Sequence, residues 1–258
     1  MIFNPVRLRD NGFSEEMIHY FMATSYDASR PMGNVAIAKI ENCIFGVLLG
    51  RYESVEPMLP RAVGWIDQAI SIQESFGKNL HFYRSRLHHA RGVASWLLDG
   101  VPREGDWDGA RVSAEAAWRL GDRVWTRHEI VSGGGLDDYM AYSWLAGPDH
   151  WEAGMEMYEH WMGDQSKFSI SGNLSPKKFV YALLLDATAR QPSSQEKLFA
   201  AGRRMLRENL QENWLGGGQG IRAATWLQIV YGVREPGLTP SETLLRAYDD
   251  MPDVTSPF

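Results

Sequence analysis

Four carboxylates recur at helical spacing in one segment of this 258-residue sequence. We call them the acidic strip: Asp149, Glu152, Glu156 and Glu159, which follow an i, i+3, i+7, i+10 pattern and share one face of a helix. Each pair of like charges at this spacing costs a helix about 0.2–0.5 kcal/mol. Something should offset that repulsion, either basic side chains elsewhere in the chain or a basic partner.

The acidic strip lies in a longer segment that has no positive charge. Between Arg127 and Lys167 the sequence contains eight Asp or Glu residues and no Lys or Arg. Such an imbalance creates a local negative field that can steer a basic partner to this surface. We therefore predict a partner interface made of Asp137, Asp138, Tyr139, Asp149, Glu152, Glu156 and Glu159.

Internal pairing of the same carboxylates is the competing interpretation. One source of cations is the segment 177–207, which carries seven basic residues and two acids. The other is a predicted helix over 79–98, where four basic side chains share one face: His81, Arg84, His88 and Arg91. Either set could neutralise the acidic strip.

No motif for catalysis or metal binding is found. Metal ligands must project onto one ion, whereas the adjacent His88 and His89 point about 100° apart on a helix. We expect the histidines to be exposed or capping residues. Cys43 lies in the apolar run NCIFGVLLG, where a thiolate is disfavoured, and we expect it in the core. We predict no catalytic residue, no metal, no cofactor and no enzymatic activity.

Two glycine-rich stretches are poor candidates for phosphate-binding loops. VSGGGLDD lacks the Lys and the Ser or Thr of a P-loop, and it places Asp137 and Asp138 where they would repel a phosphate. LGGGQGIRAA has Arg222 in the first turn of the next helix and is the better anion site of the two. We interpret both stretches as helix breaks.

The elements that carry these residues are helices. Segments 106–122 (DWDGARVSAEAAWRLGD) and 149–164 (DHWEAGMEMYEHWMGD) are loose copies of one pattern. Each opens with an acid, has a Trp in its first turn and a second Trp ten or eleven residues later, and closes with Gly-Asp. The tryptophans fall on or near the apolar stripes, which indicates core packing. The first copy looks architectural, whereas the second carries the acidic strip.

Pro, Gly and Ser or Thr caps divide the chain into about eleven or twelve helices, and no strand-like alternation interrupts them. Among these we predict short helices over 14–24, 122–131 and 136–146. The fold class is all-α, with residues 1–258 as one domain of packed antiparallel helical hairpins. A tetratricopeptide-like array and an irregular α-bundle both fit, since the repeat has only two clear copies.

Composition limits the partners. A net charge of −6 and a pI near 5.7 argue against nucleic-acid binding and permit a basic protein partner. The apolar runs are shorter than the roughly 18 residues of a membrane span, and MIFNPVRLRDNG has no apolar signal region. A single cysteine excludes an intrachain disulfide. We expect a soluble, cytoplasmic protein that binds neither membrane nor nucleic acid.

In overall character the chain resembles the α-helical immunity proteins of bacterial polymorphic-toxin and contact-dependent-inhibition systems. The resemblance is carried by residues 133–161, GGGLDDYMAYSWLAGPDHWEAGMEMYEHW, and by the closures WRLGD and WMGD of the two helix copies. It implies tight binding to one toxin domain, such as a nuclease or another enzyme with a basic active face, whose site is covered by an acidic surface.

We therefore hypothesise a non-enzymatic protein that neutralises a cognate toxin. The alternative is a tetratricopeptide-like adaptor that grips a peptide in a concave groove, for which the basic face of the helix over 79–98 is the better candidate. A helical enzyme with a carboxylate cleft is a third hypothesis.

Overall fold

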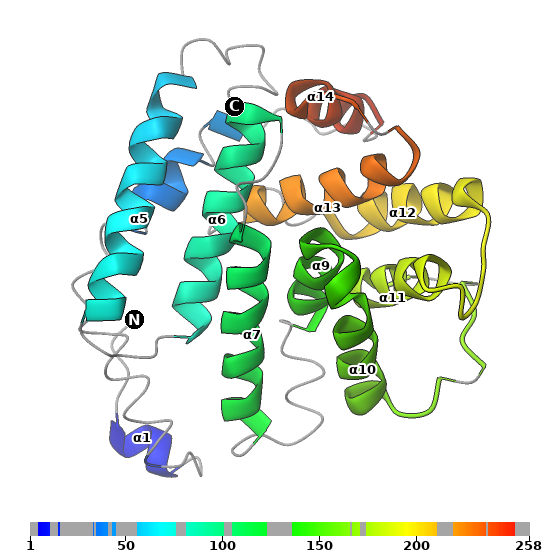
Figure 1. Ribbon diagram of the computed structural model, residues 1–258, viewed down its shortest axis with the longest axis horizontal. Helices are drawn as coiled ribbons and strands as arrows, with labels where there is room; N and C mark the ends of the chain where they lie inside the picture. Colours follow the sequence, from blue (N-terminus) through cyan, green and yellow to red (C-terminus); the bar gives the residue numbers. More distant parts are fainter. Residues whose placement is uncertain are drawn as a thin grey trace.

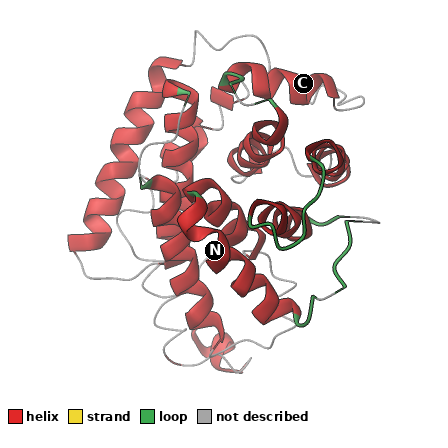
Figure 2. Cartoon of the chain, turned by 45° about the vertical axis from the view of Figure 1, so that its right-hand side comes forward, coloured by secondary structure: helices red, strands yellow, loops and turns green. Residues whose placement is uncertain are grey.

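The computed structural model describes residues 5–10, 15, 33, 35–40, 43–44, 56–75, 81–100, 105–122, 136–165, 167–170, 174–210, 219–235 and 237–250. These residues form α-helices, short 3-10 turns and loops, with no strand among them, so the predicted all-α class is confirmed (Figure 2). Ten α-helices have bounds within the described residues, slightly fewer than the eleven or twelve predicted for the chain.

The helices are α1 (Pro5–Asp10), α5 (Leu59–Ser75), α6 (His81–Asp99), α7 (Asp106–Asp122), α9 (Leu136–Ala146), α10 (Trp151–Met162), α11 (Pro176–Ala187), α12 (Gln195–Leu210), α13 (Gln219–Arg234) and α14 (Pro240–Asp250). Two 3-10 turns, η1 (Glu56–Met58) and η2 (Pro148–His150), precede α5 and α10. The predicted helices over 106–122 and 136–146 have the observed bounds. Those over 14–24 and 122–131 lie, apart from Glu15 and Asp122, outside the described residues.

Local signals explain several helix ends. The backbone N–H of Thr239 donates to the Glu242 carboxylate at 2.8 Å, and the Glu242 N–H donates to the Thr239 hydroxyl at 3.2 Å. This reciprocal pair is a capping box, which satisfies two backbone donors at the start of α14. At the end of α10, Gly163 has a φ of 83°, a conformation that glycine adopts without a Cβ clash. The predicted stop in the second helix copy is confirmed.

The helices from α5 onward form two groups that pack against each other: α5, α6 and α7 in the first, and α9 to α14 in the second (Figure 1). Helices α5, α6 and α7 stand side by side, and α9 packs against α7, α10, α11 and α13. Helices α13 and α14 return to contact α6. In an open solenoid each repeat contacts only its neighbours. These long-range contacts favour the irregular α-bundle over the tetratricopeptide-like array.

A connected cluster of buried apolar side chains runs through these helices, from Ala36 to Leu244. Cys43 belongs to it, with no exposed surface, and burial raises the pKa of its thiol to about 11. The predicted core role of this cysteine is therefore confirmed by its burial in the cluster.

A buried polar contact joins three helices inside this core. The Nε2 atom of His89 lies 2.5 Å from the hydroxyl of Thr225, whose proton is directed to the carbonyl of Ile221. The Tyr142 hydroxyl lies 2.9 Å from Nδ1 of the same ring. This pattern fits a neutral ring that carries its proton on Nε2. Burial accordingly lowers the pKa of His89 to about 3.

Candidate functional site

The two helix copies, α7 and α10, both pack on α9 through their first tryptophans. Trp107 stacks on Tyr142 of α9, with ring centroids 6.3 Å apart and an angle of 19° between the planes. Trp151 stacks on Trp144 of α9 at 5.1 Å and 11°. The core role predicted for these side chains is confirmed for Trp107, which is buried, and Trp151 is half-buried against the same core.

A glycine brings each copy close to its neighbour. A Cβ atom on Gly109 of α7 would lie 2.7 Å from Nδ1 of His88. A Cβ atom on Gly154 of α10 would lie 2.9 Å from the Cβ of Ser143. Both distances are shorter than real Cβ contacts, so each position needs a glycine for this packing. The inner faces of the two copies are thus built in the same way.

Asp106 and Asp108, the two acids in the first turn of α7, are paired with cations. Asp106, which has no exposed surface, accepts from Nε of Arg91 at 2.5 Å, and Arg91 also donates to Asp67 at 2.7 Å. On the outer side, Arg111 donates to Asp108 at 2.8 Å. A buried carboxylate is tolerated only when it is paired, so the Asp106 ion pair fixes α6 against the start of α7.

Glu115 extends the paired set along α7. Its carboxylate accepts from Arg111 at 3.3 Å and from Nε of Arg119 at 3.0 Å, and Nη2 of Arg119 also contacts it. These contacts join residues one helical turn apart. The outer face of the first copy is therefore neutralised by its own arginines.

Three residues of the predicted interface lie in α9 and are engaged inside the protein. Arg222 of α13 contacts Asp137 at 2.5 Å and Asp138 at 2.9 Å. Burial and the neighbouring Asp138 carboxylate raise the pKa of Asp137, while the two acids raise that of Arg222. Tyr139 is 1% exposed. Asp137 and Asp138 are thus paired inside the protein with Arg222 of α13, and a partner contact by these three residues stays a prediction.

The acidic strip is divided by the structure. Asp149 lies in η2, before α10 begins, and it is exposed together with Glu152 and Glu156. Among the described residues no Lys, Arg or His pairs with these three carboxylates. Glu159 differs, since it accepts from Arg190 at 2.9 Å and from the Tyr181 hydroxyl at 2.8 Å. The internal pairing predicted from segment 177–207 is therefore observed for Glu159, and its place in a partner interface stays a prediction.

The basic face of α6 does not pair with the acidic strip. His88 is buried against α7, and Arg91 binds Asp67 and Asp106. The expectation of exposed or capping histidines is wrong for His88 and His89, which are 8% and 7% exposed. The reason is that α6 has neighbours on several sides, namely α5, α7, α13 and α14. His88 and Arg91 of this face are therefore engaged by neighbouring helices.

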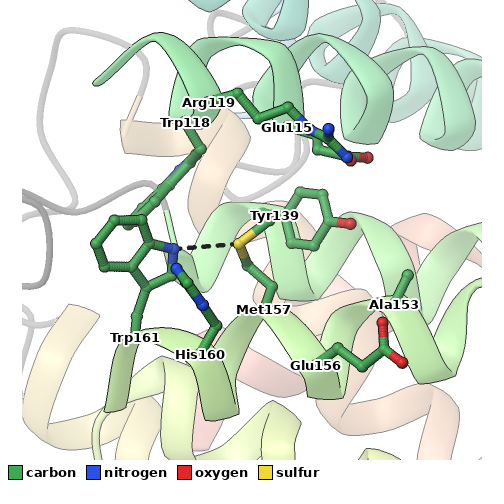
Figure 3. A pocket seen from close by; sticks show the side chains of 9 residues that line it. All are labelled: Glu115, Trp118, Arg119, Tyr139, Ala153, Glu156, Met157, His160 and Trp161. Atoms are coloured by element: carbon green, nitrogen blue, oxygen red, sulfur yellow. Dashed lines mark hydrogen bonds and ion pairs between the residues drawn. The ribbon is translucent and has the colours of Figure 1, made fainter. Parts of the chain in front are cut away.

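A cleft of about 490 Å³ lies between the C-terminal half of α7 and α10 (Figure 3). We call it the α7–α10 cleft; its lining residues are Glu115, Trp118, Arg119, Tyr139, Ala153, Glu156, Met157, His160 and Trp161. Trp118 and Trp161 are the second tryptophans of the two copies, and their ring centroids are 5.3 Å apart. The indole N–H of Trp161 points to the sulfur of Met157 at 3.2 Å.

A second cavity of about 530 Å³ lies on the other side of α10. It is lined by the Glu159–Arg190 pair, by Tyr181, and by residues 163–165 that follow α10. Glu159 and Arg190 pair with each other in this cavity, and Asp164 adds a further carboxylate to its lining.

The sequence missed the α7–α10 cleft. Its walls come from Trp118 and Trp161, which the apolar stripes assign to the core and which are indeed 6% exposed each. The cleft could have been predicted from the similar ends of the two copies, WRLGD and WMGD. Because both helices pack on α9, their second tryptophans are brought close together. Arg222, which follows the second glycine-rich stretch, binds the chain's own Asp137 and Asp138.

Further properties of the described residues bear on function. They contain no group of three or more His, Cys, Asp or Glu residues that could hold a metal ion. None of their helices is both long and apolar enough to cross a membrane. The His89 and Cys43 side chains line none of the cavities described above. Comparisons of the chain with protein-family models, curated proteins and solved structures found no match.

Proposed function

We propose that this chain is a non-enzymatic binding protein that holds a basic surface of a partner protein against Asp149, Glu152 and Glu156. The observation that carries the proposal is the contrast in charge pairing. Acids on α7 and α9 have arginines beside them, whereas these three carboxylates are exposed with no described cation. Unpaired carboxylates on one face attract a basic surface and speed its association.

The partner class that we propose is a cognate bacterial toxin domain whose active face is basic. The likeness of residues 133–161 to helical immunity proteins supports this class. An acidic surface that covers a basic active site blocks substrate entry without any chemistry of its own. Neutralisation then depends on slow dissociation, which the apolar and aromatic groups of the adjacent cleft can supply.

The test is co-expression and co-purification with the product of the gene immediately upstream, followed by association kinetics. Reversing Glu152 and Glu156 to Lys should slow association about tenfold and flatten its dependence on salt. The matched control reverses Asp10 and Asp99, which are also exposed and give the same change in net charge.

Equal rates for the wild type and the Glu152/Glu156 variant, or equal losses in both variants, would overturn the interface. Rescue of growth by co-expression tests the toxin class separately. A complex that leaves the partner's toxicity intact would contradict neutralisation while leaving the binding surface in place.

A further inference from the structure

We propose that the α7–α10 cleft is an anchor pocket for one arginine side chain of a basic protein partner. The pocket adjoins the carboxylates of the proposed binding surface, so this inference rests on the function proposed above and names the group that is recognised. Its volume of about 490 Å³ lies within the range of about 300–1,000 Å³ that is usual for binding pockets.

The charges on the α7 side of the cleft cancel. Arg111 lies between Asp108 and Glu115, and Arg119 donates to Glu115. Glu115 and Arg119, the charged residues of α7 that line the cleft, therefore neutralise each other, whereas Arg111 and Asp108 lie outside its lining. Arg119 is 74% exposed, but its guanidinium is held on the α7 side by Glu115.

The α10 side of the cleft carries a negative charge that no described cation balances. Glu156 lines the cleft and is exposed, and it is absent from the ion pairs of the described residues. Glu152 lies one turn earlier on the same face and adds to the potential at the mouth. A cation that enters from solvent would therefore be drawn to Glu156.

The remaining walls favour a planar cation over a compact one. Figure 3 shows Trp118, Trp161 and His160 on one side of the cleft and Glu115, Glu156 and the guanidinium of Arg119 on the other, with Tyr139 and Met157 between them. The two indole side chains are 6% exposed each. A guanidinium group stacks on aromatic rings and binds a carboxylate through two N–H groups at once. An ammonium group is more strongly hydrated and cannot use both walls in this way.

The test uses the full chain labelled with ¹⁵N and a short probe peptide, acetyl-Leu-Arg-Leu-amide. Its matched control is the same peptide with citrulline, which has the shape of arginine without the charge. The arginine peptide should shift the indole N–H signals of Trp118 and Trp161, which single Trp→Phe variants assign. Citrulline should bind about tenfold more weakly, since a charge-assisted hydrogen bond is lost.

Two conservative variants distinguish binding inside the cleft from non-specific electrostatic attraction to the acidic surface. Glu156→Gln should weaken binding of the arginine peptide about tenfold. Glu152→Gln removes the same charge one turn away, outside the lining of the cleft, and should change binding about twofold or less. Circular dichroism of both variants checks that α10 stays folded.

The inference is overturned if the arginine peptide, at concentrations up to about 10 mM, shifts neither indole N–H signal. Equal binding of the citrulline peptide, or equal losses in the two variants, would also overturn it. These failures are distinguishable from failure of the proposed function. If partner association depends on Glu152 and Glu156 but the arginine peptide does not bind, the proposed binding surface is supported and the arginine pocket is rejected.

Discussion

The two helix copies, α7 and α10, have the same inner frame and different outer charges. Both use a first tryptophan that stacks on α9, a second tryptophan at the shared cleft, and a glycine at a close helix contact. On α7, Asp106, Asp108 and Glu115 bind arginines, whereas Glu152 and Glu156 of α10 are exposed and unpaired among the described residues. Packing therefore fixes the position of both helices, while Glu152 and Glu156 of α10 stay exposed.

The largest expected effect comes from the buried ion pair of the first copy. Asp106→Asn should lower the free energy of unfolding by about 3–5 kcal/mol, because Arg91 then loses its buried carboxylate partner. Urea denaturation followed by far-UV circular dichroism measures the change. Asp149→Asn, at the exposed start of the second copy, is the matched control and should stay within about 0.5 kcal/mol. A loss below about 1 kcal/mol for Asp106→Asn would mean that this pair does not hold α7 to α6.

Removal of the cation shared by the acids of α9 should have the next largest effect. Arg222→Met leaves Asp137 and Asp138 without their partner and should cost about 3 kcal/mol at pH 7. Burial raises the pKa of Asp137, so the folded state binds a proton more readily than the unfolded state. Stability of the variant should therefore increase as the pH falls from 7 toward 5.

Chemical denaturation of Arg222→Met and wild type at pH 5, 6 and 7 measures this trend. A penalty that is the same at all three values would show that Asp137 stays charged without Arg222. That result would place the cost in lost packing of the arginine stem rather than in an unpaired carboxylate.

The shared inner frame predicts equal behaviour of the two close glycines. Gly109→Ala and Gly154→Ala should each destabilise the protein by about 1–3 kcal/mol, since the new methyl group would overlap His88 or Ser143. Gly64 of α5 is the control, because a Cβ atom there meets nothing within 4 Å. Gly64→Ala should stabilise the protein by about 0.5–1 kcal/mol through higher helix propensity. Thermal unfolding compares the three variants. Stabilisation by Gly154→Ala would contradict the claim that both copies need a glycine at a close helix contact.

Those features of the fold that depend on local sequence, such as helix ends, could be predicted. Periodic apolar residues and caps gave the bounds of α7 and α9, and the repeated tryptophans identified the two copies. The partners of the charged residues could not be predicted. Asp137 and Arg222 are 85 positions apart, and only packing of α13 on α9 brings them together. Burial of both His88 and His89 likewise requires helices on several sides of α6, which a single apolar stripe does not reveal.

The smallest expected effects come from removing one carboxylate on the outer face of each copy. The free energy of unfolding should change in opposite directions in the two variants. Glu156 has like-charged neighbours at Glu152 and Glu159, so Glu156→Gln should stabilise the protein slightly, by about 0.2–0.5 kcal/mol. Glu115→Gln in α7 removes a carboxylate that binds Arg111 and Arg119, and it should destabilise by about 0.5–1 kcal/mol.

Urea titrations of the two variants side by side, at low salt where surface charges are least screened, resolve this difference in sign. Destabilisation by Glu156→Gln of more than about 0.5 kcal/mol would mean that this carboxylate has a structural partner. The outer face of α10 would then be architectural, like that of α7. The opposite signs are expected because a carboxylate between two others opposes folding, whereas one that binds two arginines supports it.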